Sequence, residues 1–262
     1  MDLLSFNATT FTVFGIPPYV FFVGVGAVFA FFIFNCLLLF LKADIKLGNR
    51  VVIFSIPALL LGAKSFGVIA NIVECIMNNS SIDIDTFIYS GIVFYGGLIF
   101  FLISFWLLIH KSPLQDKVKI TDSLATSIPL FHAFGRIGCF TAGCCYGVPT
   151  NCIIGVTYTT WIQGSVSTAT RVPIQLIEAI VNIILFALLL QLVLNKKATG
   201  KLLILYILNY SIVRFIDEFF RGDIDKNILS GFSAAQLISA VLIVFVSIKL
   251  ITERKQKNVQ SR

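Results

Sequence analysis

Long runs of apolar residues are the feature that most restricts how this chain can fold. Several windows of about 20 apolar residues follow one another, which is the length of α-helix that crosses a bilayer core of roughly 30 Å. Hydrophobic residues make up 57% of the 262 positions and charged residues only 13%, so an ordinary soluble domain is excluded. The sequence therefore predicts an all-α fold, a polytopic helical bundle embedded in a membrane.

Seven transmembrane helices are predicted, and we expect them to form a single domain over residues 1–262. A short N-terminal segment precedes the first helix, residues 141–171 form the longest loop, and residues 252–262 form a polar, basic tail. The fourth helix is the least hydrophobic. The expected spans are residues 17–41, 51–73, 87–109, 122–140, 172–194, 202–220 and 232–251.

Lysines and arginines divide the predicted loops into two sets. Basic clusters follow the first, third, fifth and seventh spans, whereas the loops after the second, fourth and sixth spans lack them. Because loops rich in lysine and arginine stay in the cytoplasm, the N-terminus is expected outside and the C-terminus inside. The loop at residues 141–171 is then extracytoplasmic. This topology accounts for the net charge of +7, so we expect no nucleic-acid partner.

Polar side chains inside the predicted spans mark a candidate site, because charge is costly in hydrocarbon and its presence there is usually functional. One face of the sixth span carries Tyr210, Arg214, the adjacent pair Asp217 and Glu218, and Arg221 at helical spacing. The alternative interpretation is an ion-paired face, such as Arg214 with Glu218, that only stabilises the bundle.

Two further groups lie in the fourth and fifth spans. Gln175 and Glu178 lie one helical turn apart. They belong either to a functional site or to structural hydrogen bonds between helices. His132 and Arg136 also share a helix face. The arginine fork suits a phosphate group, and the neighbouring glycines suit either an anion or close helix packing. The histidine is either catalytic or a hydrogen-bonded structural residue.

The cysteines around residues 139–152 leave several interpretations open. Their spacing is Cys139-x4-Cys144-Cys145-x6-Cys152, which differs from the paired CxxC spacing of zinc sites. A disulfide, free packed thiols, a metal site and covalent catalysis remain as alternatives. No nucleotide-binding loop and no HExxH or GxSxG motif is present in the sequence.

The polar residues recur as ordered motifs along nearly the whole chain. They are Gly62-Ala63-Lys64, Asp122 ahead of Gly135-Arg136-x-Gly138, Arg171-x-Pro-x-Gln175-Leu-x-Glu178, Tyr210-x3-Arg214-Phe-x2-Glu218-Phe-x-Arg221 and Ser233-x2-Gln236-x2-Ser239. In order and spacing these motifs resemble those of the bacterial prolipoprotein diacylglyceryl transferase family. The seven-span, N-outside architecture of that family agrees with the topology derived from the charges.

The resemblance implies an enzyme of the bacterial cytoplasmic membrane. Such enzymes transfer a diacylglyceryl group from phosphatidylglycerol to the lipobox cysteine thiol of a prolipoprotein and release glycerol phosphate. The expected partners are therefore phosphatidylglycerol, the prolipoprotein lipobox peptide and membrane lipids, with no metal or other cofactor. Two alternatives remain: a phosphatidylglycerol-dependent transferase with another acceptor, and a lipid- or solute-binding membrane protein or transporter without transfer chemistry.

The resemblance also implies roles for single residues. Arg136 and Arg214 are expected to bind the phosphate and to stabilise the charge that develops on the leaving group. Gly138, Tyr210 and Arg221 complete the expected phosphatidylglycerol site. Positioning roles are expected for Asp122, Gln175, Glu178, Glu218 and Lys64.

Two departures from the family pattern bear on the acceptor chemistry. Tyr95 stands where the family commonly has histidine, and a phenol with an ordinary pKa near 10 is a poor base at neutral pH. Cys139 replaces the usual asparagine, and Cys144 and Cys145 fall in a segment that normally carries glutamate and tryptophan. Tyr95 and His132 are both retained as candidate bases, beside assistance from the field of the arginines.

Overall fold

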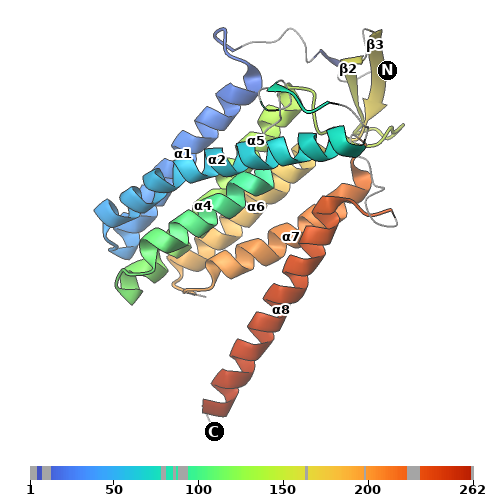
Figure 1. Ribbon diagram of the computed structural model, residues 1–262. Coiled ribbons are helices and arrows are strands. Elements are labelled where there is room, and N and C mark those ends of the chain that lie inside the picture. The colour runs from blue at the N-terminus through green and yellow to red at the C-terminus, as the bar shows by residue number, and fades with distance from the viewer. Residues whose placement is uncertain are drawn as a thin grey trace. The chain divides into compact units, whose positions relative to one another are not determined.

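The computed structural model of the chain (Figure 1) describes residues 5–7, 13–77, 81–84, 87, 94–162, 165–197, 199–222 and 231–260. These ranges form helices and one small sheet. The helices are α1 (Pro18–Leu41), α2 (Ile45–Met77), α4 (Phe94–Ile109), α5 (Leu114–Thr141), α6 (Ile174–Leu194), α7 (Leu202–Phe220) and α8 (Ala234–Gln260). The strands are β1 (Ser5–Asn7), β2 (Val156–Ile162) and β3 (Ser165–Arg171).

Several helices have the length and composition of membrane spans, so the predicted helical, multi-pass membrane class is confirmed. Within the described residues, four such helices occupy Pro18–Leu41, Ile45–Val73, Ile174–Leu194 and Ala235–Thr252, and Gly96–Ile109 is a shorter apolar helix. α5 and α7 are less apolar than these helices. They carry many of the polar side chains of the candidate site.

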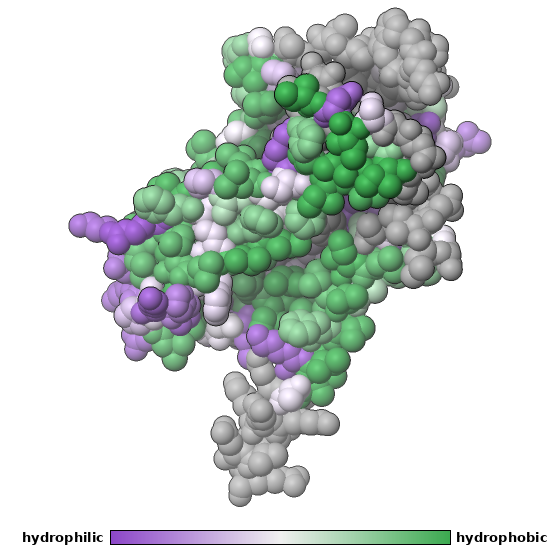
Figure 2. All heavy atoms as spheres, in the orientation of Figure 1, coloured by the Kyte–Doolittle hydropathy of each residue, from purple (hydrophilic) through white to green (hydrophobic). Residues whose placement is uncertain are grey.

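Polar side chains are buried and large apolar side chains are exposed, the reverse of a soluble protein. Val28, Phe32 and Phe245 have more than 60% of their surface exposed, and apolar residues cover most of the described surface on the face in Figure 2. Such an exterior suits contact with lipid tails. The buried polar residues of α5 to α8 include Asp122, Ser123, Thr126, Ser127, His132, Gln175, Glu178, Asn182, Ser211, Arg214, Asp217, Glu218, Ser233, Gln236 and Ser239.

The chain divides into two compact units, described one at a time. The first contains Met1–Cys36 with Thr121–Arg262, and the second contains Leu37–Ile120. The prediction of one domain over residues 1–262 stays a prediction.

In the second unit, α2 and α4 pack through small residues. A Cβ atom on Gly62 would collide with the carbonyl oxygen of Gly96, and a Cβ atom on Gly96 would collide with that of Gly62. Glycine is therefore needed at both positions for this close backbone approach. Lys64, two residues after Gly62, is half-buried. Tyr95 lies in the first turn of α4, and its side chain is outside the described residues.

In the first unit, α1 packs on α5, while α6 and α7 pack together and α7 packs on α8. The ring of Phe29 stacks on that of Phe134 with centroids 5.6 Å apart, which fixes the contact between α1 and α5. β1 pairs parallel to β2, and β2 pairs antiparallel to β3 with Tyr158 opposite Ala169. This small sheet lies in the segment that connects α5 to α6.

Several elements differ from the sequence-based prediction. Residues 141–171 contain the hairpin of β2 and β3, where only a loop was expected. Its strands are rich in threonine, valine and aromatic residues, which favour extended structure. α5 begins at Leu114, and α8 continues to Gln260 through the predicted tail. Lysine, arginine and glutamine end an apolar run but are good helix formers, so the helices continue past the apolar windows.

Candidate active site

Glu178 on α6 joins arginines from two other helices. Its Oε2 lies 2.5 Å from Nε of Arg136 on α5, and its Oε1 lies 3.2 Å from Nη1 of Arg214 on α7. The glutamate is 1% exposed, so both pairs are shielded from water. Charged groups this deep need partners, and one carboxylate here serves two cations.

Glu218 continues this network toward α8. Its Oε2 lies 2.8 Å from Nη2 of Arg214 and 3.8 Å from Nη1 of Arg221. Its Oε1 accepts a hydrogen bond of 2.6 Å from the hydroxyl of Ser233. Ser233 and Gln236 form a capping box at the start of α8, since the amide of each bonds to the side chain of the other.

The resulting ion-pair cluster consists of Arg136, Glu178, Arg214, Glu218 and Arg221. Among its arginines, the side chains of Arg136 and Arg221 are 12% exposed and that of Arg214 is 6% exposed. The two outer arginines are therefore the ones that a ligand meets first. Within the described residues, the ion pair of Arg136 uses Nε, which leaves its terminal nitrogens for such a ligand.

Asp217 completes the charge of this region. It is buried beside the cluster, where its charge interacts with those of Glu178, Arg214 and Arg136. With Asp217 ionised, three carboxylates balance the three arginines of the cluster. With Asp217 protonated, the region holds one positive charge in excess. The sequence placed Asp217 only on the general polar face of this helix.

His132 and Tyr210 form a buried pair next to the arginines. Nε2 of His132 on α5 lies 3.3 Å from Oη of Tyr210 on α7, and the ring centroids are 4.6 Å apart. The charges of Arg136 and Arg214 both act on the histidine. A predicted candidate base and a predicted lipid-binding tyrosine are therefore direct neighbours.

Gln175 connects the ion-pair helices to the turn after α5. Its Nε2 donates a hydrogen bond of 2.6 Å to the carbonyl oxygen of Cys144, and its Oε1 accepts one of 3.1 Å from Tyr158. Burial raises the pKa of Tyr158 to about 12, so its phenol remains a donor at neutral pH. The sequence did not single out Tyr158. Its place in an alternating strand is the signal that would have indicated burial.

The segment after the turn is bound to the end of α7. The amide of Val148 donates to the carbonyl of Phe220, and the amide of Gly222 donates to that of Tyr146. A Cβ atom on Gly147 would lie 2.5 Å from the carbonyl oxygen of Val172, so glycine is required for this approach. Arg171, part of a predicted motif, lies over the ring of Tyr146 at 4.4 Å from its centroid. These contacts hold the segment beside Arg221.

Asp122, a predicted supporting residue, and Gly138, a predicted lipid-binding residue, make contacts outside the ion-pair cluster. Asp122 accepts hydrogen bonds from the amides of Gly200 and Leu202, at 2.7 and 3.3 Å, and thereby caps the start of α7. It precedes Arg136 by 14 residues on α5, roughly 21 Å along the helix. Gly138 packs on α1, where an added Cβ atom would lie 3.2 Å from the carbonyl oxygen of Tyr19. Its predicted role in lipid binding stays a prediction.

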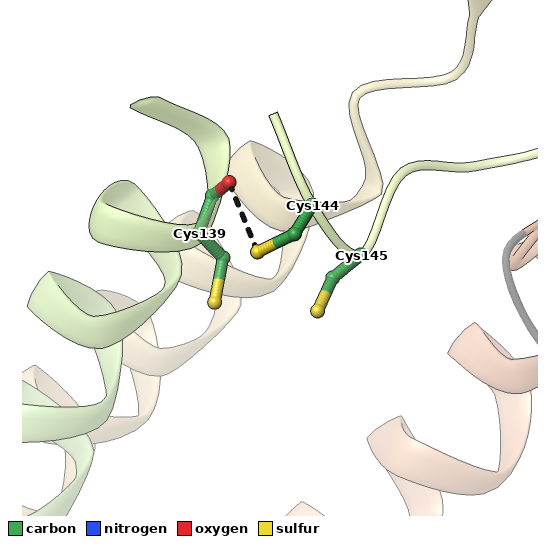
Figure 3. Close-up of side chains that lie close together, drawn as sticks. All are labelled: Cys139, Cys144 and Cys145. Carbon is green, nitrogen blue, oxygen red and sulfur yellow. Dashed lines mark hydrogen bonds between the residues drawn. The ribbon is translucent and has the colours of Figure 1, made fainter. Parts of the chain in front are cut away.

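Three cysteines converge where α5 ends (Figure 3). The Sγ atoms of Cys139, Cys144 and Cys145 all lie within 4.8 Å of one another, and none is in a disulfide. Hydrogen bonds from the Cys139 and Cys144 thiols lower the pKa of Cys145, and Arg221 and Arg136 act in the same direction. Hydrogen bonds with the side chains of Cys139 and Cys145 raise the pKa of Cys144.

Comparison with known proteins agrees with these motifs. The family model described as prolipoprotein diacylglyceryl transferase matches residues 7–252. A phosphatidylglycerol–prolipoprotein diacylglyceryl transferase of Clostridium tetani is 35% identical over 240 residues, which cover 89% of this chain and 92% of that protein. A second protein of this name, from Clostridium perfringens, is 30% identical over 87% of this chain and 88% of its own length. One from Chlorobaculum tepidum is 34% identical over 64% of this chain and 57% of its own.

Proposed function

The chain belongs to the prolipoprotein diacylglyceryl transferase family, and we propose that it transfers a diacylglyceryl group from phosphatidylglycerol to the lipobox cysteine of prolipoproteins. The observation that carries the proposal is the buried cluster of three arginines and two glutamates. A phospholipid headgroup is an anion that such a cluster can bind inside a membrane. The extent of the match to named transferases supports the same substrates.

In the proposed reaction the arginines stabilise negative charge on the phosphate. The acceptor sulfur attacks the glyceryl carbon bonded to the phosphate oxygen, the carbon–oxygen bond breaks, and its electron pair leaves with glycerol phosphate. Negative charge on the phosphate therefore increases in the transition state, where preorganised donors stabilise it. Arg136 is best suited to this role, because its terminal nitrogens form a planar fork for two phosphate oxygens.

The remaining cluster residues position the arginines. Glu178 and Glu218 hold Arg214 from both sides, and Glu218 also holds Arg221. We assign Tyr210 to the lipid-binding site, because it lies beside His132 and is buried on α7 together with Arg214. Lys64 lies in the other unit, and its supporting role remains a proposal drawn from its motif.

The acceptor thiol must lose its proton before or during attack. His132 is the predicted base that lies next to the ion-pair cluster, buried beside Tyr210 and under the charges of two arginines. Those charges oppose a further positive charge on its ring. Tyr95 remains the other proposed base.

The proposed topology has seven spans, with the N-terminus outside and the C-terminus in the cytoplasm. Basic clusters on alternate loops support it. The end of α5, the start of α6, the end of α7 and the start of α8 then all lie on the outer side, together with the ion-pair cluster. Prolipoproteins emerge on this side of the bacterial cytoplasmic membrane, the location we propose for the enzyme.

Complementation tests the proposal. The full chain is expressed in bacteria depleted of their own transferase, and lipidation of a reporter prolipoprotein is followed by its mass. We expect a diacylglyceryl-modified reporter from the wild-type chain and a strongly reduced yield from Arg136→Lys, with both chains present in the membrane at equal amounts. An unmodified reporter from the inserted wild-type chain would refute the acceptor. Phosphatidylglycerol turnover without reporter lipidation would then indicate a different acceptor, and lipid binding without turnover would indicate a non-catalytic protein or transporter.

A further inference from the structure

The cysteine trio, which consists of Cys139, Cys144 and Cys145, takes no part in the ion-pair cluster. Cys139 lies in the last turn of α5, and the other two follow in the turn after it (Figure 3). The three Sγ atoms lie within 4.8 Å of one another. Thiols brought together from two segments in this way can share one ligand.

The distances suit a thiophilic metal ion. Zinc binds cysteine sulfur at about 2.3 Å, so sulfurs around one tetrahedral zinc lie roughly 3.8 Å apart. The observed limit of 4.8 Å exceeds this spacing by roughly 1 Å. Cys144 is exposed, which gives an ion a route to the site.

The backbone of the turn supports the convergence. Cys145 has a φ of +59°, which non-glycine residues seldom adopt, and Gly143 two residues earlier has a φ of +66°. The carbonyl of Cys144 is fixed by the 2.6 Å bond from Gln175. This left-handed turn places two adjacent thiols beside Cys139, at the cost of an unfavourable conformation at Cys145.

A metal uses all three sulfurs, whereas a disulfide uses two. Adjacent cysteines pair with difficulty, so a disulfide would have to join Cys139 to one of the other two and leave the third as a lone thiol. All three are free thiols in the structure. Three thiolates around a divalent ion carry one net negative charge.

We propose that Cys139, Cys144 and Cys145 bind one Zn²⁺ ion through three thiolates, with an exchangeable fourth position that accepts the thiol of the acceptor protein. Among the described residues, the group of metal-binding side chains at this place contains these three and no fourth. Zinc sites with three protein ligands keep the fourth position for water or substrate. The sequence-based expectation of no metal is replaced by this site.

The role of the fourth position rests on the proposed transferase function. A thiol that coordinates a metal is deprotonated outright, so the acceptor enters as thiolate, its proton passes to water and the bound water leaves. The zinc-bound sulfur then supplies the electron pair for attack on the glyceryl carbon, and glycerol phosphate departs with the electrons of the broken carbon–oxygen bond. The metal would thus provide the deprotonation that the acceptor thiol needs.

Metal content tests the site without substrates or turnover. The full chain is purified in detergent with a thiol-free reductant, loaded with Zn²⁺, desalted and analysed by mass spectrometry for zinc per chain. We expect one zinc per wild-type chain and its loss in Cys139→Ser, Cys144→Ser and Cys145→Ser. Cys152→Ser is the matched control, since Cys152 is an exposed cysteine of the same segment, and it should keep the metal.

Cobalt gives a second readout that also reports the fourth ligand. Co²⁺ in the wild-type site should show sulfur-to-cobalt charge-transfer absorption and the intense visible bands of tetrahedral coordination. A lipobox peptide should change these bands, and the same peptide with serine in place of cysteine should not. Equal metal in the wild type and the triple serine variant, or a disulfide in the purified chain, would overturn the site. Cobalt absorption bands that do not change on addition of the cysteine peptide would overturn the thiol-binding role of the fourth position.

These readouts are separate from the transferase proposal. Failure of complementation with one zinc per chain refutes the acceptor and leaves the metal site standing. Lipidation by a triple serine variant at the wild-type rate leaves the transferase standing and overturns the metal's part in it.

Discussion

Replacing Glu178 by glutamine tests whether the cluster is held by buried ion pairs. The change removes one charge and little volume from a side chain that is 1% exposed and pairs with Arg136 and Arg214. Removing one partner of a buried pair costs about 3–5 kcal/mol, because the other charge stays buried without compensation. Two arginines depend on this carboxylate, although Arg214 keeps Glu218 at 2.8 Å. We therefore expect Glu178→Gln to lower the free energy of unfolding by about 3–5 kcal/mol and no more.

The assay is reversible unfolding of the full chain in one detergent, followed by tryptophan fluorescence. Asp44→Asn is the matched control, because Asp44 is exposed and asparagine can still cap α2 through the amide of Leu47. A surface change of this kind is expected to stay within about 0.5 kcal/mol.

A double-mutant cycle sharpens the test. Arg136→Gln alone leaves a buried carboxylate with a single arginine partner, and we expect a loss similar to that of Glu178→Gln. In the double variant both members of the ion pair are neutral amides, so neither leaves an unpaired charge. The loss in free energy of unfolding should therefore be smaller than the sum of the two single losses by about 0.5–3 kcal/mol. Additive losses, or a Glu178→Gln variant as stable as Asp44→Asn, would refute the ion-pair explanation of this cluster.

Four further predictions follow from other contacts. Arg136→Lys should lower phosphatidylglycerol turnover by about 10²-fold, because lysine keeps the charge but loses the fork; turnover within a few-fold of wild type would contradict the headgroup role. Asp122→Ala should cost about 1 kcal/mol of stability as a lost cap, while turnover of the folded enzyme is unchanged because the residue is roughly 21 Å along α5 from the site. Between pH 10 and 12 the free energy of unfolding of the wild type should fall more than that of Tyr158→Phe, as measured by unfolding at each pH. The reason is that the raised phenol pKa of Tyr158 adds stability below its pKa in the unfolded chain, and this stability is lost as the pH rises through its pKa in the folded chain. His132→Ala and Tyr95→Phe should each retain measurable single-turnover transfer in the zinc-loaded enzyme; abolition in either one would identify that residue as the required base.

The sequence predicted those features that depend on local patterns. Apolar windows located the helices, and helical periodicity placed Tyr210, Arg214 and Glu218 on one buried face of α7. The i,i+4 pair of Arg214 with Glu218 was also predictable, because both residues lie on one helix. The contact of Arg136 with Glu178 was not, since it joins two helices whose relative register no local pattern fixes.

Other features depend on tertiary contacts that the residue types alone do not encode. Asp122 belongs to a motif of site residues, yet it caps α7 through the amides of Gly200 and Leu202, which are close only in the folded chain. The spacing of Cys139, Cys144 and Cys145 argued against a metal site by the usual rule. That rule describes short loops between ligands, whereas here the end of a helix and a left-handed turn bring the sulfurs together.

The hydrogen bond from Gln175 to the carbonyl of Cys144 has an evolutionary consequence. Gln175 binds the main-chain oxygen of residue 144, so this bond can form whichever side chain that residue carries. Selection can exchange that side chain while the ion-pair cluster behind it stays in place. Evolution can thus change the acceptor chemistry at the turn while the ion-pair cluster stays unchanged.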